Sequence, residues 1–444
     1  MKRVKDFFIV LLVSAGVLGA GVFLVERHYK NELDKMGLLA KNKANKYPFG
    51  RRISGYTVSE NVPNFAYTVY DDRWHESSEL LDSNGFKTGG TTLTKYKPAN
   101  TIRIFITGGS AAWGSIESRE IMKDTTYPAG TYCYASTIAG KLKALLCAKY
   151  PAHRFEVIDA AVVKYRFHQN MALYYEKLHD FNPDIIINID GFNDIGNLLD
   201  YVHGNPYPMA TEQMDEELQL ETMARLPQFP YSLAFYNYKY IRTFNAAKNI
   251  VARTGRKGTI IDHEPDYKSY EAIKPYLRVS KKMLWLIDSY ERQLEADNVY
   301  SIFCLQPTLK RRVNQKALSA TETRFRAFLE KVTTGDTMKM NTGLKQSKEL
   351  SDFNDSITKK IGVDSYWLGN LIGAYLLNDC SPVFDSIVTS HGGVYVDVGK
   401  SITNLDSDKE FYVDYCHLTP FGNQYIAQLL ANKVDVFMRM KGSK

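Results

Sequence analysis

Four polar side chains stand in sequence contexts that suit nucleophilic catalysis. Ser110 follows the glycine pair of TGGSAAWGS, and Asn193 lies in DGFNDIGN. Asp414 and His417 are three residues apart in VDYCHLTPFGN. This spacing lets the carboxylate hydrogen-bond one imidazole nitrogen while the other nitrogen faces a hydroxyl group. A serine at the start of a helix, with an amide donor nearby, suits attack on a carbonyl group and stabilisation of the oxyanion that forms.

Each motif taken alone also has a structural interpretation. A capping serine in a glycine-rich turn explains the first, and the turn chemistry of Asn-Asp explains the second. A phosphate-binding loop is disfavoured, because neither G-x-G-x-x-G nor a terminal Gly-Lys-Ser/Thr is present. The five cysteines are widely spaced without CxxC or zinc spacing, so the sequence predicts no disulfide scaffold, no metal and no cofactor. We interpret Cys416 as a packing residue, since sequence neighbours such as Cys416 and His417 rarely face each other.

The elements that position these residues follow an alternating pattern. Short β-branched segments bounded by turn residues predict five buried strands, at 103–107, 155–159, 184–190, 299–305 and 394–398. Helical stretches lie between them, and a last helix is expected from Pro420, with Thr419 as its N-cap. This alternation predicts a parallel sheet covered by helices on both faces. Ligands in such folds bind beyond the carboxyl ends of the strands, where the motifs lie.

The N-terminus predicts a membrane segment. Residues 7–25 are 19 consecutive uncharged, mostly apolar positions. At ~1.5 Å per residue, a helix of this length just spans a hydrocarbon core of ~30 Å. Lys2, Arg3 and Lys5 precede the run, which favours a cytoplasmic N-terminus and an extracytoplasmic main domain. A cleavable signal peptide is the alternative, but the apolar run continues to Val25, beyond the candidate cleavage sites.

Composition and patterning together suggest the domain organisation. The 444 residues include 44% hydrophobic side chains, which excludes a disordered or fibrous chain, and the net charge of +7 is too mild to predict nucleic-acid binding. The predicted parts are an anchor at 1–26, a stalk and irregular wrapping segment at 27–99, and an α/β domain at 100–444 with insertions near 200–270 and 308–390.

In this order, the three motifs resemble blocks I, III and V of the SGNH hydrolases, the GDSL-like esterase superfamily, and in particular a membrane-anchored GGS-type subset. The residues that match the blocks are Ser110; Gly191, Asn193 and Asp194; and Asp414 with His417. The resemblance covers roughly residues 65–200 and 299–440, including DSNGFKTGG at 82–90. It implies a flavodoxin-like three-layer α/β/α sandwich of about five parallel strands, here preceded by the transmembrane helix.

The resemblance also implies roles for these residues. Ser110 would be the nucleophile, His417 the general base and then acid, and Asp414 the residue that orients His417. The oxyanion hole would use the backbone N–H of Ser110, the side chain of Asn193 and a backbone N–H from block II, which places Ala161 in that role.

Two positions depart from the family pattern. Gly109 stands where GDS motifs carry an aspartate, and Ala161 stands where block II usually has a glycine, within VIDAAVVKYR. Alanine keeps the backbone donor but restricts φ. The second departure puts catalysis in more doubt than the fold.

The function predicted from these features is a membrane-anchored, extracytoplasmic serine esterase that removes or transfers O-acyl or O-acetyl groups on a cell-envelope carbohydrate. An acylated carbohydrate or a lipid ester would be the substrate, and hydrolysis and acyl transfer would use the same residues. The alternative is a catalytically degenerate SGNH domain that binds a glycan or a partner during envelope polysaccharide assembly.

Overall fold

The computed structural model describes residues 19–32, 51–54, 57–116, 127–128, 130–194, 281–309, 317–324, 379–406 and 408–442. The chain divides into two compact units, Met1–Ile53 with Gln213–Lys257, and Ser54–Glu212 with Gly258–Lys444.

In the first unit, residues 19–32 are helical, whereas residues 7–18 of the predicted anchor lie outside the described part. Within the part that is described, no helix is both long and apolar enough to cross a membrane.

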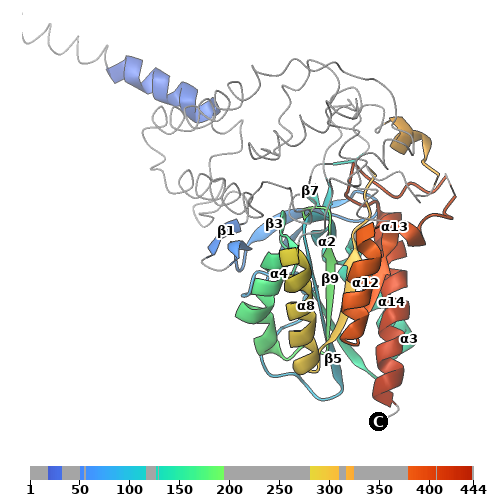
Figure 1. Ribbon diagram of the computed structural model, residues 1–444. Coiled ribbons are helices and arrows are strands. Elements are labelled where there is room, and N and C mark those ends of the chain that lie inside the picture. The colour runs from blue at the N-terminus through green and yellow to red at the C-terminus, as the bar shows by residue number, and fades with distance from the viewer. Residues whose placement is uncertain are drawn as a thin grey trace, which may run out of the picture. The chain divides into compact units, whose positions relative to one another are not determined.

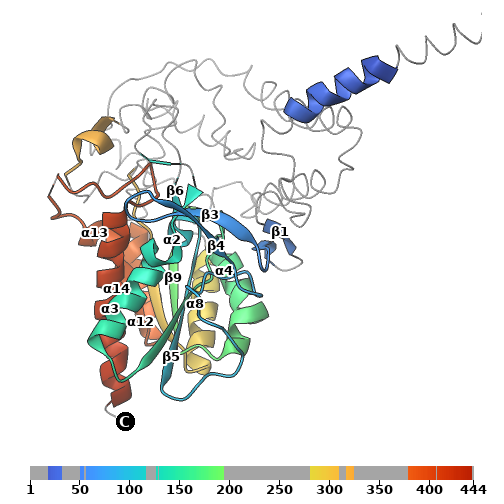
Figure 2. The ribbon, with the colours of Figure 1, turned by 180° about the vertical axis from the view of Figure 1, so that it is seen from behind.

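The second unit contains the α/β domain (Figures 1 and 2). Among the described residues, the strands are β1 (Arg51–Ser54), β2 (Val58–Asn61), β3 (Ala66–Tyr70), β4 (Glu76–Leu80), β5 (Thr101–Gly108), β6 (Ser115–Ile116), β7 (Gly130–Thr131), β8 (Arg154–Asp159), β9 (Ile185–Asp190), β10 (Tyr300–Leu305) and β11 (Val394–Asp397). Besides the helical residues 19–32, the α-helices of this described part are α2 (Ser110–Trp113), α3 (Ile138–Lys149), α4 (Phe167–Leu173), α8 (Lys281–Ala296), α12 (Ser381–Ser390), α13 (Val398–Ser401) and α14 (Pro420–Gly442). Short η turns are η2 (Tyr134–Ser136), η3 (Tyr174–Leu178) and η4 (His179–Phe181).

The central sheet has five strands in the order β11-β10-β9-β5-β8. Every neighbouring pair in it is parallel. These are the five strands that the sequence predicts, each found within a few residues of its expected bounds. Because β5 and β9 are neighbours, with Gly108 beside Ile189, the segments that follow these two strands leave the sheet side by side.

Helices cover both faces of the sheet, so the predicted three-layer α/β/α arrangement with a parallel sheet is confirmed. Helices α4, α8 and α12 lie on one face, and α3 and α14 lie on the other (Figures 1 and 2). Alternate residues of the strands feed two separate cores. Phe105 packs with the α4, α8 and α12 side, whereas Ile104 and Ile106 pack with the α3 and α14 side. This alternation is the period-two geometry of a strand buried on both faces.

Two of the segments around the expected domain are partly described. The part of the wrapping segment after Ser54 belongs to the same compact unit as the sheet, and β3 and β4 form an antiparallel pair there. At the end of the insertion expected near 308–390, α12 contacts α8 and β11. The other insertion, near 200–270, lies outside the described residues, as do 310–316 and 325–378.

The last helix begins where the sequence predicts. Thr419 Oγ1 accepts a hydrogen bond of 3.1 Å from the backbone N–H of Gly422, and Pro420 is the first helical residue. A proline is tolerated there because the first helical N–H groups have no intrahelical partner. This start places the loop that carries Asp414 and His417 against the carboxyl end of the sheet.

Candidate active site

Ser110 lies at the carboxyl end of β5, a strand in the interior of the central sheet. The strand ends at Gly108, Gly109 is the N-cap, and Ser110 is the first residue of the single helical turn α2. No side chain caps this turn, and Gly114 closes it in the left-handed conformation with a φ of 77°. The backbone N–H groups of the first turn are therefore not occupied by a capping side chain, which leaves a positive local field around the Ser110 hydroxyl group.

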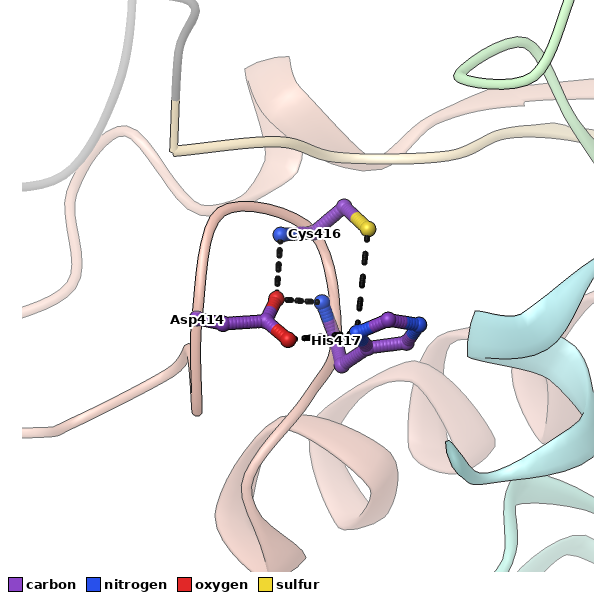
Figure 3. Close-up of side chains that lie close together, drawn as sticks. All are labelled: Asp414, Cys416 and His417. Atoms are coloured by element: carbon purple, nitrogen blue, oxygen red, sulfur yellow. Dashed lines mark hydrogen bonds and ion pairs between the residues drawn. The ribbon is translucent and has the colours of Figure 1, made fainter. Parts of the chain in front are cut away.

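His417 connects Ser110 to Asp414. Its Nε2 atom lies 2.7 Å from Ser110 Oγ, and its Nδ1 atom lies 2.5 Å from Asp414 Oδ2. The second carboxylate oxygen, Oδ1, accepts hydrogen bonds of 2.8 Å from the backbone N–H groups of Cys416 and His417. Figure 3 shows the carboxylate enclosed by these donors, with the far ring nitrogen of His417 pointing away from it. The structure therefore brings Ser110, His417 and Asp414 into the serine–histidine–aspartate arrangement.

Burial and charge shift the pKa values of Asp414 and His417 in opposite directions. Asp414 and His417 are 3% and 2% exposed. Burial lowers the pKa of His417, but the Asp414 carboxylate outweighs it and, with a smaller effect of Cys416, raises that pKa well above its usual value. Burial raises the pKa of Asp414, but the charge and hydrogen bond of His417 and the two backbone donors lower it overall. Asp414 therefore stays ionised and stabilises the imidazolium that forms when His417 takes a proton.

Cys416 is buried beside the imidazole ring. Its Sγ atom lies 3.9 Å from His417 Nδ1, and its backbone oxygen accepts a hydrogen bond from Gln306 Nε2 at 3.4 Å. The ligand atoms of Asp414, Cys416 and His417 lie within 4.8 Å of one another, a spacing that also suits a metal ion. In this site, however, both ring nitrogens of His417 already have partners, one of which is the serine hydroxyl group. We therefore assign this cluster to the triad.

Asn193 lies against the turn that carries Ser110. Its Nδ2 atom donates a hydrogen bond of 2.8 Å to the backbone oxygen of Tyr165. A Cβ atom built on Gly109 would lie only 2.3 Å from that Nδ2 atom. The absence of a side chain at position 109 is thus what admits Asn193 to this place, which gives a physical reason for the departure from the GDS pattern.

Ala161 is not placed as an oxyanion donor. Its backbone N–H donates a hydrogen bond of 3.1 Å to Asp159 Oδ1, and its carbonyl oxygen accepts one of 3.1 Å from Asn61 Nδ2. The side chain is fully buried. The residues of this loop that approach Gly109 come later, at Tyr165, and Lys164 just before it has a φ of 71°. A positive φ, the backbone conformation that favours glycine, thus occurs in this loop at Lys164 and not at Ala161.

Asp194 and Gly191 support the loop around Asn193. Asp194 Oδ1 accepts a hydrogen bond from the first helical residue of α4, Phe167, at 3.0 Å, and its Oδ2 atom accepts one from Gly191 at 3.3 Å. Burial raises the pKa of Asp194 to about 6, against the lowering effect of these bonds and of Arg166. Gly191 has a φ of 123°, which a larger residue adopts only under strain. Both residues fix the backbone around Asn193.

Two residues that hold the site were not recognised in the sequence. Glu322 is fully buried, and its Oε1 atom accepts hydrogen bonds from the backbone N–H groups of Phe411 and Tyr412, at 2.7 and 3.1 Å, just before Asp414. A capping box with Ser319 is the signal that could have located it, since Ser-x-x-Glu marks a helix start. The other residue is Lys87, whose ammonium group donates a hydrogen bond to the carbonyl oxygen of Trp113 at the end of α2.

No protein-family model and no curated protein matches the chain. Among solved structures, it is similar to LAE5, an alpha/beta hydrolase enzyme from the metagenome of Lake Arreo, Spain, with 12% identity and a TM-score of 0.33 over 76% of this chain and 96% of that one. It is also similar to a mutant of Axe2, an acetyl-xylooligosaccharide esterase from Geobacillus Stearmophilus, with 10% identity and a TM-score of 0.34 over 75% and 94% of the two chains. A GDSL-like lipase from Parabacteroides merdae gives 11% identity and a TM-score of 0.29 over 74% and 92%.

The descriptions of these three proteins name an alpha/beta hydrolase, an acetyl-xylooligosaccharide esterase and a GDSL-like lipase. In the structure of this chain, the residues of the three sequence motifs lie together at the carboxyl end of the sheet, with Ser110 bonded to His417 and Asn193 beside the Ser110 turn.

Proposed function

We propose that this chain is a serine esterase in which Ser110 is the nucleophile, His417 the general base and Asp414 the residue that orients His417. The observation that carries the proposal is the continuous path from Ser110 Oγ to His417 Nε2, at 2.7 Å, and from His417 Nδ1 to Asp414 Oδ2, at 2.5 Å. The first separation is within the range that proton transfer from serine to histidine requires, and the second is the hydrogen bond by which Asp414 orients the ring.

The reaction follows from these positions. Ser110 Oγ attacks the carbonyl carbon of the ester while its proton moves to His417 Nε2. The tetrahedral intermediate collapses as the ester C–O bond breaks, and His417 returns the proton to the departing alkoxide, which leaves as the alcohol. Water, or a sugar hydroxyl group in a transfer reaction, then attacks the acyl-enzyme with His417 again as base, which releases the acid or the new ester and restores Ser110.

The developing oxyanion needs donors, and two are assigned to it. The backbone N–H of Ser110 belongs to the uncapped first turn of α2. An amide side chain carries two N–H donors, and Asn193 uses one of them for the Tyr165 carbonyl oxygen. The second is assigned to the oxyanion. Removal of one such donor typically costs ~3 kcal/mol of transition-state stabilisation.

The substrate class we propose is an acylated carbohydrate. Phe192 and Tyr415, each next to a motif residue in the chain, form a ring pair with centroids 5.4 Å apart and tilted by 37°. Tyr415 also lies beside the His417 ring, at 6.1 Å. Aromatic faces at this place suit stacking against the apolar face of a sugar ring. Hydrolysis and transfer of the acyl group remain two versions of this proposal, which differ only in the acceptor.

We also propose that residues 7–25 anchor the chain in the cell membrane, with the catalytic domain on the extracytoplasmic side. The support is the apolar run and the basic residues before it. Fractionation of cells that express the full-length chain tests this: it is expected in the membrane fraction, resistant to carbonate extraction. Recovery in the soluble fraction at full length contradicts the anchor.

The decisive experiment compares the wild type with Ser110→Ala. The full-length chain, purified in mild detergent, is expected to hydrolyse p-nitrophenyl acetate and to be labelled by a fluorophosphonate probe. Ser110→Ala should lose labelling and about 10³-fold or more of the turnover while staying folded, as judged by circular dichroism. A folded wild type that neither turns over the ester nor takes the probe rejects the esterase and favours the glycan- or partner-binding module.

A further inference from the structure

Lys87 is a lysine whose charged group is buried under the catalytic turn. The residue is only 1% exposed. A lysine is rarely this buried unless its ammonium group has partners for all its protons. Here Nζ donates to the carbonyl oxygen of Trp113 at 2.7 Å, to Thr131 Oγ1 at 3.0 Å and to the carbonyl oxygen of Tyr132 at 3.2 Å.

The first of these partners ends the helical turn of the nucleophile. Trp113 is the last residue of α2, and Ser110 is the first. A single turn of helix does not hold its own geometry in water, so its contacts must fix it. Lys87 supplies two of them, since Nζ both bonds the Trp113 carbonyl oxygen and lies 3.8 Å from the centroid of the Trp113 ring.

The third partner, Tyr132, connects Lys87 to the loop that carries His417. The hydroxyl group of Tyr132 donates a hydrogen bond of 3.1 Å to the carbonyl oxygen of Leu418, the residue after His417. Tyr132 is thus the single residue that links Lys87, through hydrogen bonds, to the loop that carries His417. Its own backbone pairs with Asp159 at the end of β8, with 3.0 Å in both directions, just before the block II loop.

We propose that Lys87 is a positioning residue: its ammonium group holds the turn of Ser110 and, through Tyr132, the loop of His417 at the separation that proton transfer requires. Lys87 touches neither the substrate nor the reacting atoms, and its role rests on the esterase function proposed above. Lys87 lies in the segment DSNGFKTGG, at residues 82–90, which is outside the three motif blocks.

The surroundings of Lys87 are consistent with a charged ammonium group at neutral pH. Burial lowers the pKa of Lys87 to about 8, and the carboxylates of Asp159 and Glu79 oppose that effect. The face of an indole ring stabilises a cation but not a neutral amine. A substitution that removes the charge and the donors takes the Lys87 hydrogen bond from the buried carbonyl oxygen of Tyr132 and leaves that of Trp113 with the longer bond of 3.4 Å from Thr131 Oγ1.

The test uses Lys87→Met, which keeps the length of the side chain, in the full-length protein. The number of competent sites is titrated with the fluorophosphonate probe, and kcat is expressed per titrated site. Misplacement of a catalytic group by about 1 Å costs up to ~100-fold in rate, so kcat per site should fall between about 10- and 100-fold, with KM changed by less than about threefold. Lys87→Arg, which keeps the charge and several donors, should recover most of that loss.

Lys141 provides the matched control. It is also a buried lysine, at 8% exposure, and its Nζ atom pairs with Asp72 Oδ2 at 2.5 Å. Lys141→Met should leave kcat per site within about twofold of the wild type, since no motif residue is attached to it. Equal losses in Lys87→Met and Lys141→Met, or a normal kcat per site in folded Lys87→Met, overturn the proposal.

If Lys87→Met does not fold, Thr131→Val decides the question. This change keeps the shape of the side chain but removes one acceptor of the ammonium group, together with the hydrogen bonds from Thr131 Oγ1 to the carbonyl oxygens of Gly114 and Trp113. With this network broken, kcat per site should fall about three- to tenfold. An unchanged kcat in Thr131→Val contradicts the positioning role. A wild type without labelling or turnover rejects the esterase function itself, which distinguishes the two failures.

Discussion

At the residue scale, the chemistry depends on one buried imidazole and the carboxylate behind it. Asp414 has a partner for each carboxylate oxygen, so its position is fixed by three hydrogen bonds before any substrate binds. A carboxylate held in this way selects the tautomer of His417 with a proton on Nδ1 and leaves Nε2 as the acceptor for the serine proton. The same carboxylate lies next to the positive charge that His417 carries once it has taken the serine proton, and stabilises that charge.

This arrangement predicts how the reaction depends on pH. Only neutral His417 can accept the serine proton, so kcat/KM should rise with pH through the His417 pKa, which Asp414 holds well above the usual 6.5 against the lowering effect of burial. In Asp414→Asn, burial remains and the opposing charge is gone, so the midpoint should move to lower pH.

The same substitution should lower kcat by about 10³- to 10⁴-fold, because the amide favours the wrong tautomer. A pH–rate profile of p-nitrophenyl acetate hydrolysis by both proteins measures these effects. Asp435→Asn, at a partly exposed pair with Lys149, is the control. A variant Asp414→Asn with an unshifted midpoint would show that the carboxylate does not set the pKa of His417.

At the element scale, the loops after β5 and β9 lie side by side because these strands are neighbours, and the loop before α14 brings His417 to Ser110 from 307 positions further along the chain. The period and composition of the five strands were sufficient to predict the sheet, and the three motifs were sufficient to predict Ser110, Asn193, Asp414 and His417 at its carboxyl end. Ala161 was misplaced because sequence alone does not show where φ turns positive in a loop. The roles of Lys87 and Glu322 are not predictable from sequence, because lysine and glutamate are usually exposed to solvent and the burial of these two results from tertiary packing.

Glu322 makes this point testable. Its carboxylate is the acceptor for the N–H groups of Phe411 and Tyr412, which begin the loop that carries Asp414. Glu322→Ala leaves these buried donors unpaired and should destabilise the fold by about 2–4 kcal/mol, whereas Glu322→Gln keeps an acceptor oxygen and should cost less. Hydrogen exchange should show lost protection at residues 411 and 412 in Glu322→Ala. Unchanged protection there contradicts the role of Glu322, and Glu295→Ala, on the exposed side of α8, is the control.

At the scale of the whole molecule, the domain buries several ionisable groups. Their protonation affects the rate of the reaction and the stability of the fold in different ways. The reaction needs neutral His417 and improves as pH rises. Stability follows the opposite trend, because buried carboxyl groups are more costly once they ionise. Burial raises the pKa of Asp194 to about 6 and that of Glu291 to about 7. A pH increase that activates the triad therefore also ionises carboxyl groups in the interior.

Glu291 allows this conflict to be measured. It is 1% exposed on the inner face of α8, where burial raises the pKa of its carboxyl group more than Ser301 and His391 lower it. The unfolded chain loses the Glu291 proton near 4.5, whereas the folded protein keeps it up to about 7. Since the folded state binds the extra proton in this window, the contribution of Glu291 to stability falls as pH rises from about 4.5 to 7. Above that range its contribution no longer changes with pH.

Glu291→Gln removes this titration without changing the shape of the side chain. At one pKa unit per ~1.4 kcal/mol, the variant should be more stable than the wild type by about 1–3 kcal/mol at pH 8, with little difference at pH 4.5. Urea unfolding at the two pH values, with Glu295→Gln as the exposed control on the same helix, measures the difference. An equal effect of Glu291→Gln at both pH values would mean that packing, and not the proton, accounts for it. A larger effect at pH 8 would show that the fold tolerates a buried carboxylate in the same pH range in which His417 becomes a base.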